Sequence, residues 1–285
     1  MFRGQKLAAV VSISLGLSLF LLSPAARGSL AGTALSFAGS DVAIVPDNSL
    51  FHDIENQDAV TIEAWVCISS FPQGWFSIVD KYNSGSDFGW IFQIQANDNL
   101  QFVAGPGPTA LVPWSPSLDQ PYHVAMSYDR SQGVLDFYVD GALLSSVAYD
   151  ADIQATDSAA MFLGYNPSGG DEYNDGQIDE LRIWNRALSA AEIGSRFNAP
   201  LTGTESGLVG YWRFDEGAGE TFADASPNGL DGQLLTGPIW AESCALLVPE
   251  PATWMLALSG LVGVVAFVGH RRFAAITKHS RPLIV

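Results

Sequence analysis

Apolar and polar residues alternate with a period of two along most of the chain, the pattern of half-buried β-strands. It predicts strands at residues 64–68, 75–79, 90–94, 122–128, 135–139, 161–164, 177–184 and 208–214. Asp140 and Gly141 separate the strand at 135–139 from residues 142–144, a strong signal for a two-residue hairpin turn. Many short strands joined by turn residues predict an all-β fold, in which two antiparallel sheets form a sandwich or jelly roll.

Helical periodicity is nearly absent, with one exception. Ser189 and Glu192 have the spacing of a capping box, in which each side chain caps the backbone N–H of the other residue. This pattern predicts one short helix that ends near Phe197.

An apolar run near the start of the chain interrupts the strand pattern. Residues 7–22 are apolar, follow Arg3 and Lys6, and precede several small residues. This is the order of a secretory signal peptide. We therefore expect residues 1–31 to be a signal peptide and not part of the fold.

A second apolar run lies near the end of the chain. Residues 252–268 carry no charge and are long enough for a short transmembrane helix. Arg271 and Arg272 follow this run, and positive residues stay on the cytoplasmic side of a membrane. We expect residues 273–285 to form a cytoplasmic tail.

The triplet Pro249, Glu250 and Pro251 stands directly before the second run and ends the folded body, because proline lacks an N–H and restricts its predecessor. The order of triplet, apolar helix and basic cluster over residues 248–272 resembles the PEP-CTERM sorting signal of Gram-negative bacteria. The resemblance implies export, an inner-membrane anchor and processing by an exosortase-type enzyme. It also implies a final place at the cell surface or in the extracellular polysaccharide matrix. The alternative is an ordinary C-terminal anchor that is not processed.

Residues 33–247 form the body between these ends, and about 215 residues suffice for one all-β domain. The body holds 29 of the 30 acidic residues but only six of the 13 Lys and Arg residues. This excess of negative charge argues against nucleic acid or an anionic lipid surface as a partner. It also supplies oxygen ligands for calcium.

Cys67 and Cys244 are the only cysteines. In an oxidising compartment a lone pair is often a disulfide, and this one would join an early strand to the end of the domain. The alternative is two separate buried thiols. With His52 and His123 as the only histidines of the body, the usual Cys/His zinc cluster is excluded.

Several segments of the body resemble LamG-like domains, which have a concanavalin A-like jelly roll. These segments are residues 37–39, 42–46, 60–66, 78–83, 122–125, 138–141 and 178–189. Residues 210–219 and 224–232 resemble elements that often begin such a domain, although here they come last. We expect them to complete the same sandwich, with Trp240 packed near its closing strand. The resemblance implies binding through loops or the concave face, and frequent calcium.

The loop at residues 224–232 is the strongest candidate for a metal site. Side-chain oxygens are available from Asp224, Asn228 and Asp231, and Asp179 or Glu180 on a neighbouring strand would add to them. Calcium prefers several such ligands, and the resemblance favours a structural calcium ion. The alternative is an Asx-turn loop in which these side chains cap their own backbone.

Aromatic residues are the candidates for sugar binding. Tyr82 and Trp114 are flanked by polar loops and are the aromatic side chains best placed to stack on a glycan. The acidic loop at residues 171–175 is either part of a binding rim or a solvated turn.

Catalytic patterns are weak. Retaining glycosidases of this fold set paired carboxylates on one strand face, but Gln177 stands where their signature has its first Glu, and Glu63 is alone on its strand. His123 lies on an apolar strand and is expected to be packed in the core. We therefore expect an exported, non-catalytic protein that binds a glycan or a matrix partner. The alternatives are a glycan-cleaving enzyme on the same fold and a structural matrix component without a discrete ligand.

Overall fold

The computed structural model of the protein describes residues 32–55, 59–83, 88–105, 107–153, 159–167, 169–170, 172–237 and 239–247. The predicted signal peptide, transmembrane helix, sorting residues and cytoplasmic tail all lie outside these ranges. Within them, no helix has the length and apolar character needed to cross a membrane.

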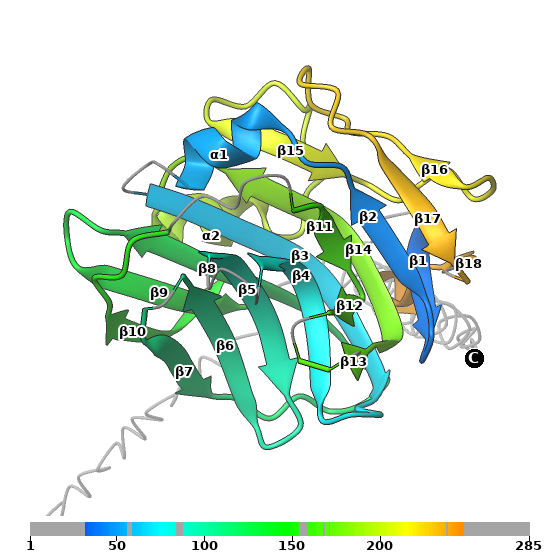
Figure 1. The fold of residues 1–285 in the computed structure, drawn as a ribbon, viewed down its shortest axis with the longest axis horizontal. Coiled ribbons are helices and arrows are strands. Elements are labelled where there is room, and N and C mark those ends of the chain that lie inside the picture. The colour runs from blue at the N-terminus through cyan, green and yellow to red at the C-terminus, as the bar shows by residue number, and fades with distance from the viewer. Residues whose placement is uncertain are drawn as a thin grey trace, which may run out of the picture.

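Two antiparallel sheets packed face to face make up the fold, which confirms the predicted sandwich (Figure 1). Sheet A contains β1 (Thr33–Ala38), β3 (Ala59–Ser70), β8 (Pro121–Asp129), β9 (Val134–Val139), β10 (Ala142–Ala148), β14 (Asp175–Trp184), β15 (Leu208–Trp212) and β18 (Ile239–Glu242). Its strand order is β10-β9-β8-β3-β14-β1-β18, and β15 also pairs with β14.

Sheet B contains β2 (Val42–Val45), β4 (Trp75–Asn83), β5 (Phe88–Gln95), β6 (Asn99–Ala104), β7 (Thr109–Pro113), β11 (Met161–Leu163), β16 (Thr221–Phe222) and β17 (Gly232–Thr236). Its strand order is β16-β17-β2-β11-β4-β5-β6-β7. A separate small hairpin pairs β12 (Tyr165–Asn166) with β13 (Glu172–Tyr173).

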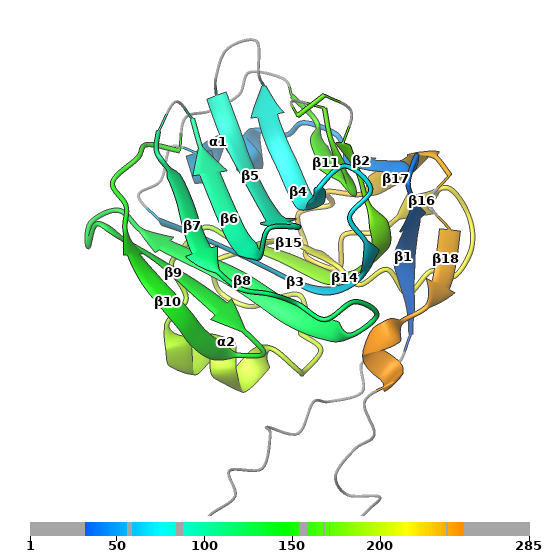
Figure 2. The ribbon, with the colours of Figure 1, turned by 90° about the horizontal axis from the view of Figure 1, so that it is seen from below.

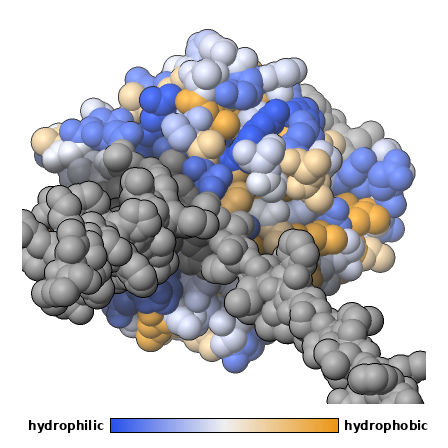
Figure 3. All heavy atoms as spheres, turned by 180° about the vertical axis from the view of Figure 1, so that it is seen from behind, coloured by the Kyte–Doolittle hydropathy of each residue, from blue (hydrophilic) through white to orange (hydrophobic). Residues whose placement is uncertain are grey.

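The helices are short. They are α1 (Ser49–Glu55), α2 (Ala190–Arg196) and the 3-10 turn η1 (Cys244–Leu247). Figure 2 shows the two sheets as layers, with α2 on the outer side of sheet A. The face that carries α2 is largely hydrophilic, with scattered hydrophobic residues (Figure 3).

Alternation along the strands creates the core between the sheets. On β7, for example, Ala110 and Val112 are buried, whereas Thr109, Leu111 and Pro113 are exposed. Residues such as Phe76, Phe92 and Phe102 from sheet B and Val66, Phe137 and Ile178 from sheet A fill this single main core. Burial of this apolar area is the main favourable contribution to folding.

Local signals in the sequence are confirmed. Ser189 accepts a hydrogen bond from the backbone N–H of Glu192, and the Glu192 side chain caps Ser189 in return. Asp140 and Gly141, with φ of 50° and 75°, form the turn between β9 and β10. Such left-handed backbone matches the twist of a hairpin, and glycine adopts it without strain.

The last strands complete both sheets, as expected. β15 pairs with β14 and β18 with β1 in sheet A, while β17 pairs with β2 in sheet B. Trp240 is half-buried against the core and donates a hydrogen bond to the carbonyl of Gly219. The helix α1 was not expected, because seven residues are too few for helical periodicity to stand out.

Candidate functional site

The loop proposed for calcium is held by its own hydrogen bonds. The carboxylate of Asp224 accepts from the backbone N–H of Tyr211, Ser226 and Leu230 and from the hydroxyl of Ser226. Asp231 accepts from the N–H of Asp224, and Asn228 donates to the carbonyl of Val209. These contacts are those of the Asx-turn alternative.

The two acidic residues predicted to complete the calcium site have other partners. Asp179 accepts a hydrogen bond from the hydroxyl of Ser243, and Glu180 accepts from Arg182 and from the hydroxyl of Tyr211. In the described ranges, no three His, Cys, Asp or Glu side chains are grouped so that they could hold a metal ion. The side-chain oxygens of this loop are thus paired within the protein, and the calcium ion stays a prediction.

The two cysteines, far apart in sequence, meet on the outer side of sheet A. Both are free thiols, and a hydrogen bond between them lowers the pKa of Cys67 and raises that of Cys244. The backbone N–H of Cys244 donates to the side chain of Gln177, which is the cross-strand neighbour of Cys67. The fold thus places the predicted disulfide partners side by side.

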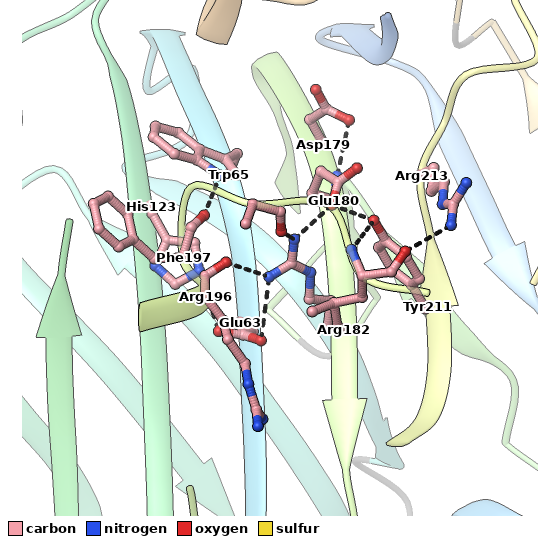
Figure 4. A network of polar contacts seen from close by, with 12 residues as sticks. Glu63, Trp65, His123, Asp179, Glu180, Arg182, Arg196, Phe197, Tyr211 and Arg213 are labelled. Atoms are coloured by element: carbon pink, nitrogen blue, oxygen red, sulfur yellow. Dashed lines mark hydrogen bonds and ion pairs between the residues drawn. The ribbon is translucent and has the colours of Figure 1, made fainter. Parts of the chain in front are cut away.

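A buried charged network lies on the outer face of sheet A (Figure 4). Arg182 of β14 is fully buried, and its guanidinium donates to Glu180 at 2.6 Å and lies 3.6 Å from Glu63. Glu63 also lies 3.2 Å from His123 and accepts a hydrogen bond from Trp184. Every carboxylate of this network therefore faces a cation or a donor.

The network holds the segment after α2 against sheet A. Arg182 donates to the carbonyls of Arg196 and Ala199, and Trp65 donates to that of Phe197. Burial alone would raise the pKa of Glu63, but the His123 hydrogen bond and the Arg182 charge lower it to about 2. His123 is buried, as expected, and its ring packs against Trp65 and Phe197. These contacts join β3, β8, β14 and the segment after α2, which gives the network a structural role.

A polar surface of a different kind covers the outer face of sheet B. Cross-strand neighbours lie on the same side of a sheet. Ser77 pairs with Gln93, Gln93 with Gln101, and Gln101 with the outward Leu111. In the next row, Asp80 lies between Ile91 and Phe162. We call Ser77, Asp80, Gln93 and Gln101, with the half-exposed aromatic residues Phe162, Tyr165 and Tyr173, the β4 face.

Three side chains of the β4 face are buried with a polar atom unpaired. Ser77, Asp80 and Gln93 are 1%, 0% and 4% exposed. The Ser77 hydroxyl, one carboxyl oxygen of Asp80 and the amide oxygen of Gln93 have no hydrogen-bond partner among the described residues. Buried polar atoms are nearly always paired. The sheet A network also has unpaired atoms, but on the ion-paired side chains Glu63, His123 and Arg182, so the three on the β4 face are the ones that point to a ligand or to bound water.

The hairpin of β12 and β13 borders this surface. Asn174, directly after β13, bonds both the N–H and the carbonyl of Ser77. Tyr165 and Tyr173 are stacked with ring centroids 4.8 Å apart, and Tyr165 contacts Phe162 edge-on. Burial, together with the charge of Glu172, raises the pKa of Asp80 to about 8 although the Tyr82 N–H lowers it. The described part of the 171–175 loop therefore pairs with β12 and packs beside β4, and its place in a binding rim stays a prediction.

The predicted sugar-stacking residues divide between two places. Tyr82 lies on β4 two residues after Asp80, and its N–H donates to Asp80. Trp114 lies beyond β7, packs edge-on against Tyr122 and contacts the core. The aromatic cluster of Phe162, Tyr165 and Tyr173 was missed, because its two-residue strands are too short to show a pattern.

Comparison with protein families decides the classification. Residues 37–194, more than half of the chain, match the family described as the concanavalin A-like lectin/glucanases superfamily. The chain belongs to this superfamily. Residues 247–272 match the PEP-CTERM protein-sorting motif. The motif indicates an exported protein that is anchored in the membrane before processing.

Solved structures share the fold of this superfamily member. A protein from Bacteroides ovatus, described as a putative carbohydrate binding protein, is 19% identical with a TM-score of 0.60, over 74% of this chain and 60% of that one. The heptameric pentraxin of Limulus polyphemus is 15% identical with a TM-score of 0.52, over 74% of this chain and 95% of that one. The chain thus spans less than two thirds of the Bacteroides protein. A comparison with curated proteins gave no match.

Proposed function

We propose that this protein is a non-catalytic glycan-binding protein that an exosortase-type enzyme processes, and that it works at the cell surface or in the polysaccharide matrix. The observation that carries the proposal is the β4 face. Side-chain amide, hydroxyl and carboxyl groups next to aromatic rings are the combination that recognises sugars, because hydroxyls need hydrogen bonds and sugar rings stack on aromatic faces.

The comparisons support this proposal through the fold. The Bacteroides ovatus structure is described as carbohydrate binding. Because sandwiches of this kind host many functions, the site has to carry the argument. The buried carboxylates of sheet A serve the network described above and not an open site.

Binding is tested with a glycan array and the full-length protein in detergent. We expect wild-type protein to retain a subset of glycans, and Gln93→Ala to lose them, since this change removes a buried amide group from the β4 face. The matched control is Gln132→Ala, which lies in the exposed turn between β8 and β9. Equal binding by both variants would contradict the β4 face as the site. Release of reducing ends from a polysaccharide would favour the enzymatic alternative.

Sorting is tested separately. Replacing Pro249, Glu250 and Pro251 with alanine should leave the protein at its precursor size in membranes, as seen by immunoblot of cell fractions. A variant that is processed normally would favour a plain anchor.

We also propose that Cys67 and Cys244 form a disulfide after export. Contact between the thiols supports it, and the disulfide would tie Cys244, which stands five residues before Pro249, to β3. Thiol-exchange enzymes of the oxidising compartment would accept the two electrons and protons. Alkylation of denatured, unreduced protein should label neither cysteine if the bond is present.

A further inference from the structure

We infer that the β4 face selects uncharged glycans and rejects glycans that carry carboxylate or sulfate groups. This inference rests on the proposed function, because it assigns the ligand class of the same site. It follows from the acidic and neutral polar side chains on this face and from the position of the described cations elsewhere in the fold. In Figure 1 the β4, β5 and β6 strands that carry the face lie toward the viewer.

The ionisable groups identified on the β4 face and its rim are acids and tyrosines. Asp80 is at its centre, and Glu172 of β13 is close enough for its charge to act on Asp80. Glu172 accepts a hydrogen bond from Asn166, and burial raises its pKa. An anionic ligand would therefore meet carboxyl groups on this face, both with raised pKa, and none of the described cations.

Every cation of the described residues lies elsewhere. Arg182, Arg186, Arg196 and Arg213 all belong to β14, α2 or the segments beside them on sheet A, and Arg130 lies in the β8–β9 turn. Lys81 is on β4, but it pairs across the sheet with the core residue Trp90 and so points inward. Its ammonium group bonds Asp47 at 2.8 Å.

This arrangement leaves no counter-charge for a uronate or sulfate. Removing an anion from water without a cation or several donors is strongly unfavourable. Like charges placed together across an interface add several kcal/mol to this penalty. Neutral hydroxyl and acetamido groups do not incur it.

The unpaired atoms match neutral groups. The Ser77 hydroxyl both donates and accepts, and the Gln93 amide oxygen accepts. Burial raises the pKa of Asp80 to about 8, which favours at pH 7 the carboxylic acid form that can donate a proton. A sugar hydroxyl can pair with all three, because it is both donor and acceptor.

Isothermal titration with three hexasaccharides tests the inference: cellohexaose carries hydroxyls, chitohexaose adds acetamido groups, and hexaguluronate carries carboxylates. We expect at least one neutral probe to bind at pH 7 and low salt, and hexaguluronate to bind at least roughly tenfold more weakly. Hexaguluronate binding as tightly as the neutral probes overturns the inference alone. Absence of any glycan binding, here and on the array, overturns the proposed function as well.

A charge insertion checks the location. Leu111 is 44% exposed on β7 and lies in the row of Gln93 and Gln101. Leu111→Lys should increase hexaguluronate affinity several-fold at low salt, whereas the matched control Gln132→Lys should leave it unchanged. Equal affinities in the two variants would show that the β4 face does not set the charge preference.

Discussion

The outer faces of the two sheets bury polar residues in different ways. On sheet A, the carboxylates of Glu63 and Glu180 meet Arg182, His123, Trp184 and Tyr211, and α2 with its following segment closes the surface. On sheet B, Ser77, Asp80 and Gln93 are equally buried and each keeps an unpaired atom. Glu63, His123 and Arg182 of sheet A also keep such atoms, but these side chains lie in ion pairs with one another.

This difference distinguishes polar side chains that stabilise the fold from polar side chains that we propose bind a ligand. A buried charge that is paired contributes to a single packed arrangement, and removing one partner leaves the other uncompensated. A buried polar atom without a partner costs stability, and a ligand that pairs it recovers that cost. We therefore assign folding to the sheet A network and binding to the β4 face.

The largest expected effect is on sheet A. Arg182→Met should lower the free energy of unfolding by about 3–5 kcal/mol, because Glu63 and Glu180 lose their shared cation. Urea unfolding followed by tryptophan fluorescence measures it. Gln93→Met, an equally buried change on the β4 face, should cost about 1 kcal/mol or less, since one amide oxygen is unpaired already. Similar losses in both variants would contradict the comparison.

The second largest effect should be a loss of stability at low pH, caused by protonation of Glu63 in the sheet A network. The pKa of Glu63 is lowered to about 2 in the folded state from an ordinary value of 4.5. Its stabilisation is complete above pH 4.5 and is lost as the pH falls through 2. Thermal melts from pH 5 to 2 should show this decline, and Glu63→Gln should flatten it. A decline of unchanged steepness in Glu63→Gln would assign acid unfolding to other groups.

The β4 face should contribute a pH dependence of stability with the opposite sign. Asp80 has its pKa raised to about 8 from 3.8, mainly by burial, so its contribution to stability falls as the pH rises from 3.8 to 8. Asp80→Asn should therefore stabilise the protein at pH 9, on the order of 1 kcal/mol. The control is Asp150→Asn at an exposed position.

The affinity for a glycan should also depend on the protonation of Asp80. The other titratable groups near Asp80 are Glu172, the tyrosines Tyr82, Tyr165 and Tyr173, and Lys81, which points inward and bonds Asp47. Affinity for a neutral glycan should fall above about pH 8 in the wild type, as Asp80 loses its proton, and stay level in Asp80→Asn. A wild-type affinity that is constant to pH 10 would remove Asp80 from the site.

The smallest expected effect concerns the loop at residues 224–232. Both carboxylate oxygens of Asp224 are paired within the protein, as on sheet A. We expect a chelator to leave the melting temperature unchanged. A fall that calcium reverses would establish the predicted calcium site, through linkage of binding to folding.

Much of the fold follows from the sequence because its causes are local. Period-two alternation, the Asp140–Gly141 turn and the Ser189–Glu192 capping box each act within a few residues. The matches over residues 37–194 and 247–272 rest on motifs that are visible in order along the chain. Class, export and sorting were therefore predictable.

Only the tertiary structure decided which face each polar side chain occupies. A β-bulge between Ser77 and Val79 shifts the register of β4, so Ser77 and Asp80 lie outward and Lys81 inward, where strict alternation would reverse the last two. The β4 face also unites the neighbouring strands β4 and β5 with β11, β12 and β13, which come much later in the chain. Alternation along the sequence gives every strand two faces. Pairing with strands distant in the chain decides which side chains share each face, and on β4 it separates the proposed binding residues from the core residues.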